Sequence, residues 1–346
     1  MGINYLEKIQ LPHLPSAYGA MLAGVAYVIM GAGIPTMMPG VLDGLSKHEA
    51  VTYPLHVVGA ENGDDSLARF DPRDYMEGDH PQLERPRFLP IIASNVLATT
   101  MLRRSNGTVD GFVIEGPTAG GHNAPPRGQM RVNERDEPIY GEKDVVDLGK
   151  IRGLGLPFWV AGGCGSAEKL REVLDAGGNG VQVGTAFALC EESGMVDEYR
   201  TALLQKATAG TAGVVTDRLA SPTGFPFKVA QLEETLSAED VYLARTRVCD
   251  LGYLRELYRK DDGSIGYRCS SEPVENYRAK GGDEPNTLGR KCICNALVAN
   301  AGHPQVHKDG SVEKALVTCG DDLAEIVVQD SQGTIHSLDG TTSVST

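Results

Sequence analysis

The chain has 346 residues, 41% of them hydrophobic and 23% charged, which is the composition of a globular protein with a large core. Its formal net charge of −14 argues against nucleic acid as a partner, because an acidic surface repels phosphate backbones. No apolar run reaches the roughly 18 residues that cross a bilayer, and seven cysteines without a signal-peptide pattern favour reduced thiols, so we expect a cytoplasmic protein with no membrane partner.

The first two-thirds of the chain alternates short apolar runs with helical patterns. Residues 1–23 predict a helix with Leu14, Tyr18 and Leu22 on one side. Five apolar runs follow, at residues 25–30, 88–93, 111–114, 157–161 and 180–183. They are apolar throughout rather than alternating, which predicts parallel strands that are buried on both faces. The fold class is therefore α/β, either a barrel or an open sheet.

The clearest helical pattern lies between the last two of these runs. Ser166 can cap its first turn, Glu168 lies at its positive end, and Gly177 follows its last residue. Strand, helix and strand at this spacing form a right-handed parallel unit.

The remaining segments set the domain organisation. Residues 40–86 are acidic and contain prolines, and we expect them to run over the surface. Beyond residue 195 the strand pattern fades, and residues 237–259 predict a helix. We therefore expect a barrel portion at residues 1–230 and a C-terminal extension, mainly helical or irregular, at residues 231–346.

Two glycine-containing pairs follow neighbouring strands. Gly162-Gly163 and Gly184-Thr185 each stand where a strand ends and the next helix begins. Glycine lets backbone N–H groups approach an anion closely, and in (β/α)₈ barrels two consecutive strand ends often share one phosphate. The alternative is that the glycines only make tight turns; two pairs at adjacent strands favour a phosphate site.

One histidine stands in a loop of small residues after the run at 111–114. His122 follows Gly120-Gly121, and Glu115 marks the end of the strand. Imidazole exchanges a proton near neutral pH, and small neighbours leave room for a flat ligand. A solvated or packing histidine is the alternative. The position after a strand's carboxyl end favours a functional one.

Three segments together resemble the nitronate monooxygenase family, formerly called 2-nitropropane dioxygenase, which includes flavin-dependent enoyl-acyl-carrier reductases. They are Glu115-Gly-Pro-Thr-Ala-Gly-Gly-His122, Val160-Ala-Gly-Gly163 and Gly180-Val-Gln-Val-Gly-Thr-Ala-Phe187. The resemblance implies an FMN-dependent (β/α)₈ barrel with His122 as catalytic base. It implies a cofactor site built from Glu115, Gly120, Gly121, Gly162, Gly163, Gln182, Gly184 and Thr185.

The implied function is oxidation of an alkyl nitronate or a similar carbon acid with O₂. The loop after His122, residues 123–128, is longer and stiffer than in the family, which puts the nitronate in doubt. The alternatives are an enoyl-thioester reductase that uses NAD(P)H and FMN, and a non-catalytic barrel fragment. FMN is expected rather than FAD or a dinucleotide, because the loops offer one phosphate site and no Gly-x-Gly-x-x-Gly opens a helix.

The five apolar runs match the fourth to eighth strands of such a barrel. An eight-unit barrel takes about 250 residues, so we expect an incomplete barrel with about the last five βα units and a missing N-terminal segment. Open sheet edges favour association, so a homo-oligomer is a further expectation.

The cysteines near the C-terminus raise the question of a metal. Cys292-Ile-Cys294 stands near Cys269, Cys319, His303 and His307. Zinc sites prefer two to four residues between paired cysteines, and one residue fits poorly. We therefore expect thiols rather than a metal site.

Overall fold

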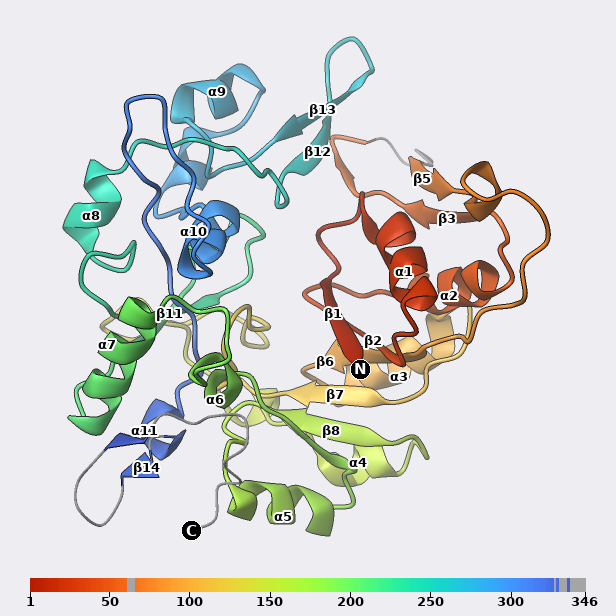
Figure 1. Cartoon of the computed structure of the whole chain (residues 1–346), viewed down its shortest axis with the longest axis horizontal. Helices are drawn as coiled ribbons and strands as arrows, with labels where there is room; N and C mark the ends of the chain where they lie inside the picture. The colour runs from red at the N-terminus through yellow and green to blue at the C-terminus, as the bar shows by residue number, and fades with distance from the viewer. Residues whose placement is uncertain (61–65, 327, 330–334, 337–346) are drawn as a thin grey trace. The chain divides into compact units, whose positions relative to one another are not determined.

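The computed structural model describes residues 1–60, 66–326, 328–329 and 335–336 (Figure 1). The main element is a six-stranded sheet whose strands follow one another in chain order. From edge to edge it consists of β1 (Gly2–Leu6), β2 (Tyr27–Gly31), β6 (Arg87–Ile92), β7 (Phe112–Glu115), β8 (Phe158–Ala161) and β9 (Gly180–Gln182). The pairings of β1 with β2, β2 with β6 and β6 with β7 are parallel. This confirms the α/β prediction, and sequential parallel strands are the arrangement of part of a (β/α)₈ barrel.

Helices occupy the connections between these strands. They are α1 (His13–Leu22), α3 (Asn95–Arg104), α4 (Leu148–Arg152) and α5 (Ala167–Asp175). The predicted cap of α5 is confirmed, because the Ser166 hydroxyl accepts a hydrogen bond from the N–H of Lys169 at 3.2 Å. Glu168 lies in the first turn, where a negative charge is favourable.

The prediction of one helix over residues 1–23 is wrong for its first part. Residues 2–6 form β1, and the helix begins only at His13. Leu14 and Tyr18 are buried as expected, whereas Leu22 is 54% exposed. β1 is an edge strand of five partly exposed residues, so it lacks the continuous apolar run that marked the other five strands.

The backbone groups into two compact units, each assembled from three stretches of chain. The first contains Met1–Ile114, Val146–Trp159 and Arg255–Arg268. The second contains Glu115–Val145, Val160–Leu254 and Cys269–Thr346.

In the first unit, the segment 40–86 contains regular structure. Helix α2 (Met38–Ser46) packs beside α1 and buries Val41, Leu42 and Leu45 almost completely (Figure 1). Four short elements follow: β3 (Val51–Pro54), β4 (Val57–Val58), β5 (Leu67–Phe70) and the 3₁₀ turn η1 (Pro72–Asp74). β3 and β5 pair antiparallel, and residues 61–65 lie outside the described residues.

The helix predicted over residues 237–259 is a second error. Only α8 (Glu239–Ala244) is helical there. Residues 256–259 form β12 (Glu256–Arg259), which pairs with β13 (Ile265–Arg268) in an antiparallel hairpin. The turn between them places Gly263 at φ +80°, and Asp-Gly is a strong hairpin signal that the helical reading overlooked.

The second unit holds the other elements. They are η2 (Glu142–Asp144), α6 (Thr185–Ala188), α7 (Asp197–Thr208), β10 (Val214–Asp217), β11 (Phe227–Ala230), α9 (Val274–Ala279), η3 (Glu284–Thr287), α10 (Ile293–Asn300), α11 (Leu323–Ile326), β14 (Val328–Gln329) and β15 (Ile335–His336). A buried cluster joins α7, β11, α11 and the segment before α11. Its members include Leu203, Leu204, Ala207, Ala230, Leu232, Val317, Cys319, Leu323 and Ile326.

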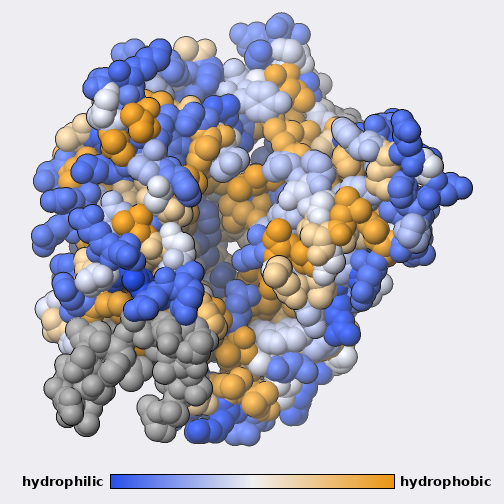
Figure 2. Space-filling model, viewed as in Figure 1, coloured by the Kyte–Doolittle hydropathy of each residue, from blue (hydrophilic) through white to orange (hydrophobic). Residues whose placement is uncertain are grey.

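On the face drawn in Figure 2, hydrophilic residues are interspersed with hydrophobic ones. Within the described ranges, every helix is too short or too polar to cross a membrane.

Candidate functional site

A cavity of about 330 Å³ in the second unit collects the loops that follow β7, β8 and β9. All eight residues expected at a cofactor site line it, namely Glu115, Gly120, Gly121, Gly162, Gly163, Gln182, Gly184 and Thr185. These residues span 71 positions of sequence, and the ends of three strands bring them together. The volume is within the range of small-molecule sites in proteins.

The glycines of the β8 loop have a conformation that other residues rarely adopt. Gly162 and Gly163 have φ values of +93° and +64°. A Cβ at Gly162 would lie 2.8 Å from the N of Ala119 and 2.9 Å from Oγ1 of Thr118, so the β7 loop packs directly on this backbone. A Cβ at Gly184 would meet no atom within 4 Å. The β7 and β8 loops are therefore closely packed on each other at Gly162, whereas the space beside Gly184 is open.

His122, in the loop that follows β7, lies against strand β11. The N–H of Lys228 donates to the carbonyl of Gly121 at 2.8 Å, and the N–H of Asn123 donates to the carbonyl of Pro226 at 2.9 Å. The His122 ring meets the Phe227 ring edge-on, with centroids 4.8 Å apart and an interplanar angle of 77°. Two backbone hydrogen bonds thus fix the main chain on either side of His122, and edge-on contacts with the rings of Phe225 and Phe227 orient its side chain.

The protonation of His122 follows from its surroundings. Burial lowers the pKa of His122 to about 4, so the ring is neutral at pH 7 and one nitrogen can accept a proton. Its Nε2 atom lies 2.7 Å from the Ser221 hydroxyl oxygen. Among the described residues, the cavity lining on this loop ends at Gly121, so His122 lies next to the cavity rather than in its wall.

Glu115 contributes a neutral carboxyl group to the cavity wall. Burial raises the pKa of Glu115 to about 8, so it is protonated at pH 7 and can donate a hydrogen bond.

A fourth segment reaches the cavity, and the sequence patterns did not identify it. Thr318, Cys319, Gly320 and Asp322 line the same cavity as the three loops. The Thr318 hydroxyl accepts from the N–H of Gly121 at 2.8 Å, and the N–H of Gly320 donates to Oγ1 of Thr185 at 2.9 Å.

This segment crosses two of the expected loops and completes the wall. The one available signal was a short buried run, Ala315-Leu-Val317, followed by Thr-Cys-Gly. That run repeats the pattern of an apolar stretch leading into a glycine-containing loop.

The cysteines do not form a metal site in the part of the chain that the structure describes. No group of three or more potential ligands is placed to hold an ion there. All seven cysteines are free thiols, and burial raises the pKa of Cys269 to about 12 and that of Cys294 to about 11. These thiols therefore remain protonated at neutral pH.

Residues 87–220 match the family model described as nitronate monooxygenase. A nitronate monooxygenase of Pseudomonas aeruginosa is 39% identical over 117 residues, which cover 34% of this chain and 32% of that protein. A (3aS,4S,5R,7aS)-5-hydroxy-7a-methyl-1-oxo-octahydro-1H-indene-4-carboxyl-CoA dehydrogenase of Mycobacterium tuberculosis is 30% identical over 124 residues, 36% of this chain and 30% of that one. The match therefore spans about a third of the length of these relatives.

Among solved structures, FabK from Thermotoga maritima aligns with 94% of this chain and 69% of its own length. The TM-score is 0.48 and the sequence identity 16%.

Proposed function

We propose an FMN-dependent oxidoreductase for this chain, since its residues 87–220 match the family model described as nitronate monooxygenase. The substrate would be an alkyl nitronate or a similar small carbon acid, and O₂ the oxidant. The observation that carries the proposal is the convergence of eight residues, expected from three separate motifs, on one cavity beside His122.

The residues present fit FMN. Glycine backbone at positive φ beside open space at Gly184 suits a phosphate, and the Thr185 hydroxyl and the Gln182 amide can hydrogen-bond polar groups of the ligand. The neutral Glu115 adds no charge that would repel an anion at pH 7. Gly120, Gly121, Gly162 and Gly163 would keep the wall thin enough for a flat ring to lie against the backbone.

His122 would take the α-proton of a neutral carbon acid such as a nitroalkane, which leaves the corresponding nitronate anion for oxidation. Its neutral ring has an acceptor nitrogen, and its place beside Gly121 puts it at the edge of the cavity. The redox chemistry would be supplied by bound FMN, so the protein's share is to position the substrate and move one proton. The negative charge that develops on the substrate as its proton leaves would stabilise the imidazolium form of His122.

A second candidate is an FMN-dependent enoyl-thioester reductase that uses NAD(P)H. The observation in its favour is the relative from Mycobacterium tuberculosis, whose name describes a dehydrogenase acting on a carboxyl-CoA. The longer loop at residues 123–128 also favours a substrate different from a small nitronate.

The test is an absorbance spectrum of the purified full chain after reconstitution, followed by identification of the released flavin. We expect FMN, and oxygen uptake that depends on an alkyl nitronate. Release of FAD, or no flavin after reconstitution, contradicts the proposal. Anaerobic bleaching of the flavin by NADPH without nitronate would select the reductase, and flavin without turnover in either assay would select a non-catalytic protein.

A further inference from the structure

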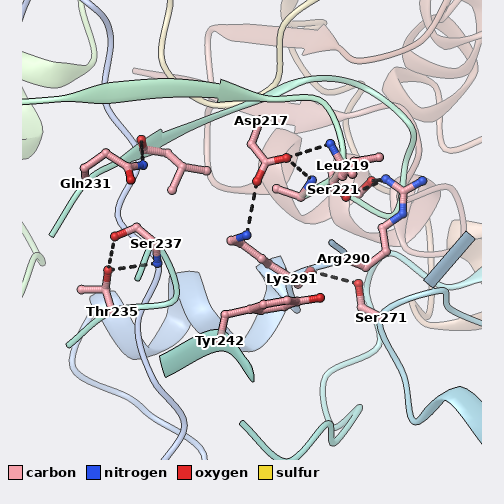
Figure 3. A network of polar contacts seen from close by, with 12 residues as sticks. Asp217, Leu219, Ser221, Gln231, Thr235, Ser237, Tyr242, Ser271, Arg290 and Lys291 are labelled. Atoms are coloured by element: carbon pink, nitrogen blue, oxygen red, sulfur yellow. Dashed lines mark hydrogen bonds and ion pairs between the residues drawn. The ribbon is translucent and has the colours of Figure 1, made fainter. Parts of the chain in front are cut away.

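Two adjacent basic residues hold three consecutive carbonyl groups of the loop that contacts His122. The Arg290 guanidinium donates through Nη1 to the carbonyls of Leu219, at 2.7 Å, and of Ser221. The N–H of Lys291 donates to the carbonyl between them, that of Ala220, at 2.9 Å. Figure 3 shows the Arg290 guanidinium pointing at the loop from the side opposite to Asp217.

The same loop is fixed by a carboxylate. One oxygen of Asp217 accepts from the N–H groups of Leu219 and Ala220 at 2.8 and 2.9 Å. Its other oxygen lies 3.2 Å from Nζ of Lys291, which also stands 4.6 Å above the ring of Tyr242 (Figure 3). Charged groups therefore satisfy the N–H groups of Leu219 and Ala220 and the carbonyls of Leu219 and Ser221, and such bonds are stronger than neutral ones.

The loop ends in a hydroxyl that contacts the proposed base. Ser221 is fully buried, and its Oγ lies 2.7 Å from Nε2 of His122 and 2.7 Å from Oγ1 of Thr223. The N–H of Thr223 also donates to it, at 3.2 Å. Because a serine hydroxyl has one proton, it either accepts the proton of Nε2 or donates to Nε2. In the first case Nδ1 is the free acceptor of the neutral ring, and in the second the single acceptor, Nε2, is already occupied.

We propose that Arg290 is a positioning residue that, through Ser221, holds His122 in one ring orientation and one tautomer. It lies 70 positions beyond the family match at residues 87–220, so the family resemblance does not assign it. The inference rests on the proposed function only because that function assigns the proton transfer to His122. The effect on the ring is measurable without any substrate.

The variant is Arg290→Gln in the full chain, and the readout is the ¹⁵N chemical shifts of the His122 ring, assigned with His122→Asn. We expect the wild type to show one dominant tautomer and the variant to show averaged shifts, because the Ser221 carbonyl loses its donor. Arg290→Lys should give an intermediate result, since one ammonium cannot reproduce the planar guanidinium. Ser221→Ala, which leaves the Arg290 contacts in place, should give averaged shifts as well.

Arg85→Gln is the matched control. Arg85 also donates to two backbone carbonyls, those of Pro86 and Thr108, but it lies in the first unit and contacts none of residues 217–223. It should leave the His122 shifts unchanged, which separates a positioning effect from a general loss of stability.

In turnover assays we expect Arg290→Gln to lower kcat by ~10-fold with KM nearly unchanged, a smaller loss than removal of a base. Unchanged ¹⁵N shifts in Arg290→Gln and Ser221→Ala would overturn the inference even where His122→Asn abolishes turnover. Altered shifts together with an active His122→Asn would instead refute the role of His122 as base and leave the positioning intact.

Discussion

His122 Nε2 lies 2.7 Å from the hydroxyl oxygen of Ser221, although 99 positions separate the two residues in the chain. The contact joins the loop after a parallel strand to the loop of the β10–β11 hairpin. When Nε2–H donates to this hydroxyl, Nδ1 is the unprotonated nitrogen of the neutral ring and is available to accept a proton.

Removal of the imidazole tests that role directly. His122→Asn should keep the fold and the flavin while turnover falls by ~10²-fold or more, the usual scale for loss of a general base. Steady-state oxygen uptake with a neutral nitroalkane measures the change, because an alkyl nitronate has already lost the proton that the base removes. The exposed His303→Asn is the control and should be fully active. Wild-type kinetics in His122→Asn would leave the packing interpretation standing.

The low pKa of His122 also predicts a dependence of stability on pH. The folded-state pKa is about 4 and the unfolded value about 6.5, so the unfolded chain binds more protons between these limits. The free energy of unfolding therefore falls as pH drops from 6.5 to 4, by at most ~3 kcal/mol from this group. Urea unfolding at pH 7 and pH 4.5 should show a smaller decrease for His122→Asn than for wild type. Equal decreases would mean that His122 is not held in its neutral form.

Part of the site was predictable because its residues stand at the ends of apolar runs. Five of the six strands of the main sheet, and eight of the 19 residues that line the cavity, follow from that pattern and from the motifs. The edge strand β1 was missed because half-exposed residues give no continuous run. Its side chains alternate instead, with Ile3 and Tyr5 partly buried and Gly2 and Asn4 exposed, and five residues are too few to separate this alternation from the helical pattern that follows.

Ser221, Thr318 and Arg290 could not be predicted as partners of the site. Each acts through a tertiary contact: Ser221 with the ring of His122, Thr318 with the backbone of Gly121, and Arg290 with the carbonyls of the 219–221 loop. Local sequence carries no record of which distant backbone groups remain unsatisfied, and only the folded chain identifies them.

The positive φ of Gly163 makes a prediction about flavin binding. Gly163→Val should abolish FMN binding, because a β-branched side chain blocks the approach of a phosphate to the backbone. The φ of +64° also strains the folded state, by roughly 1–2 kcal/mol. Gly210→Val controls for that strain, since Gly210 has a φ of +66° and a Cβ there meets no atom within 4 Å. Thermal unfolding should show that both variants are destabilised, and fluorescence titration should show that only Gly163→Val fails to bind FMN. Equal FMN affinities of the two variants would show that the phosphate does not bind at this loop.

The Thr318 hydroxyl should contribute to FMN affinity although it lies outside the family match. Thr318→Val keeps the shape and removes the acceptor for the N–H of Gly121, a hydrogen bond worth about 1 kcal/mol. The β7 loop is then less well ordered, and FMN should bind ~5-fold more weakly. Thr318→Ser should bind FMN like the wild type. Thr208→Val removes a hydroxyl that donates to the carbonyl of Leu204 on α7 and should leave the affinity unchanged. An unchanged FMN dissociation constant in Thr318→Val would show that this segment closes the cavity without ordering the loop that holds the ligand.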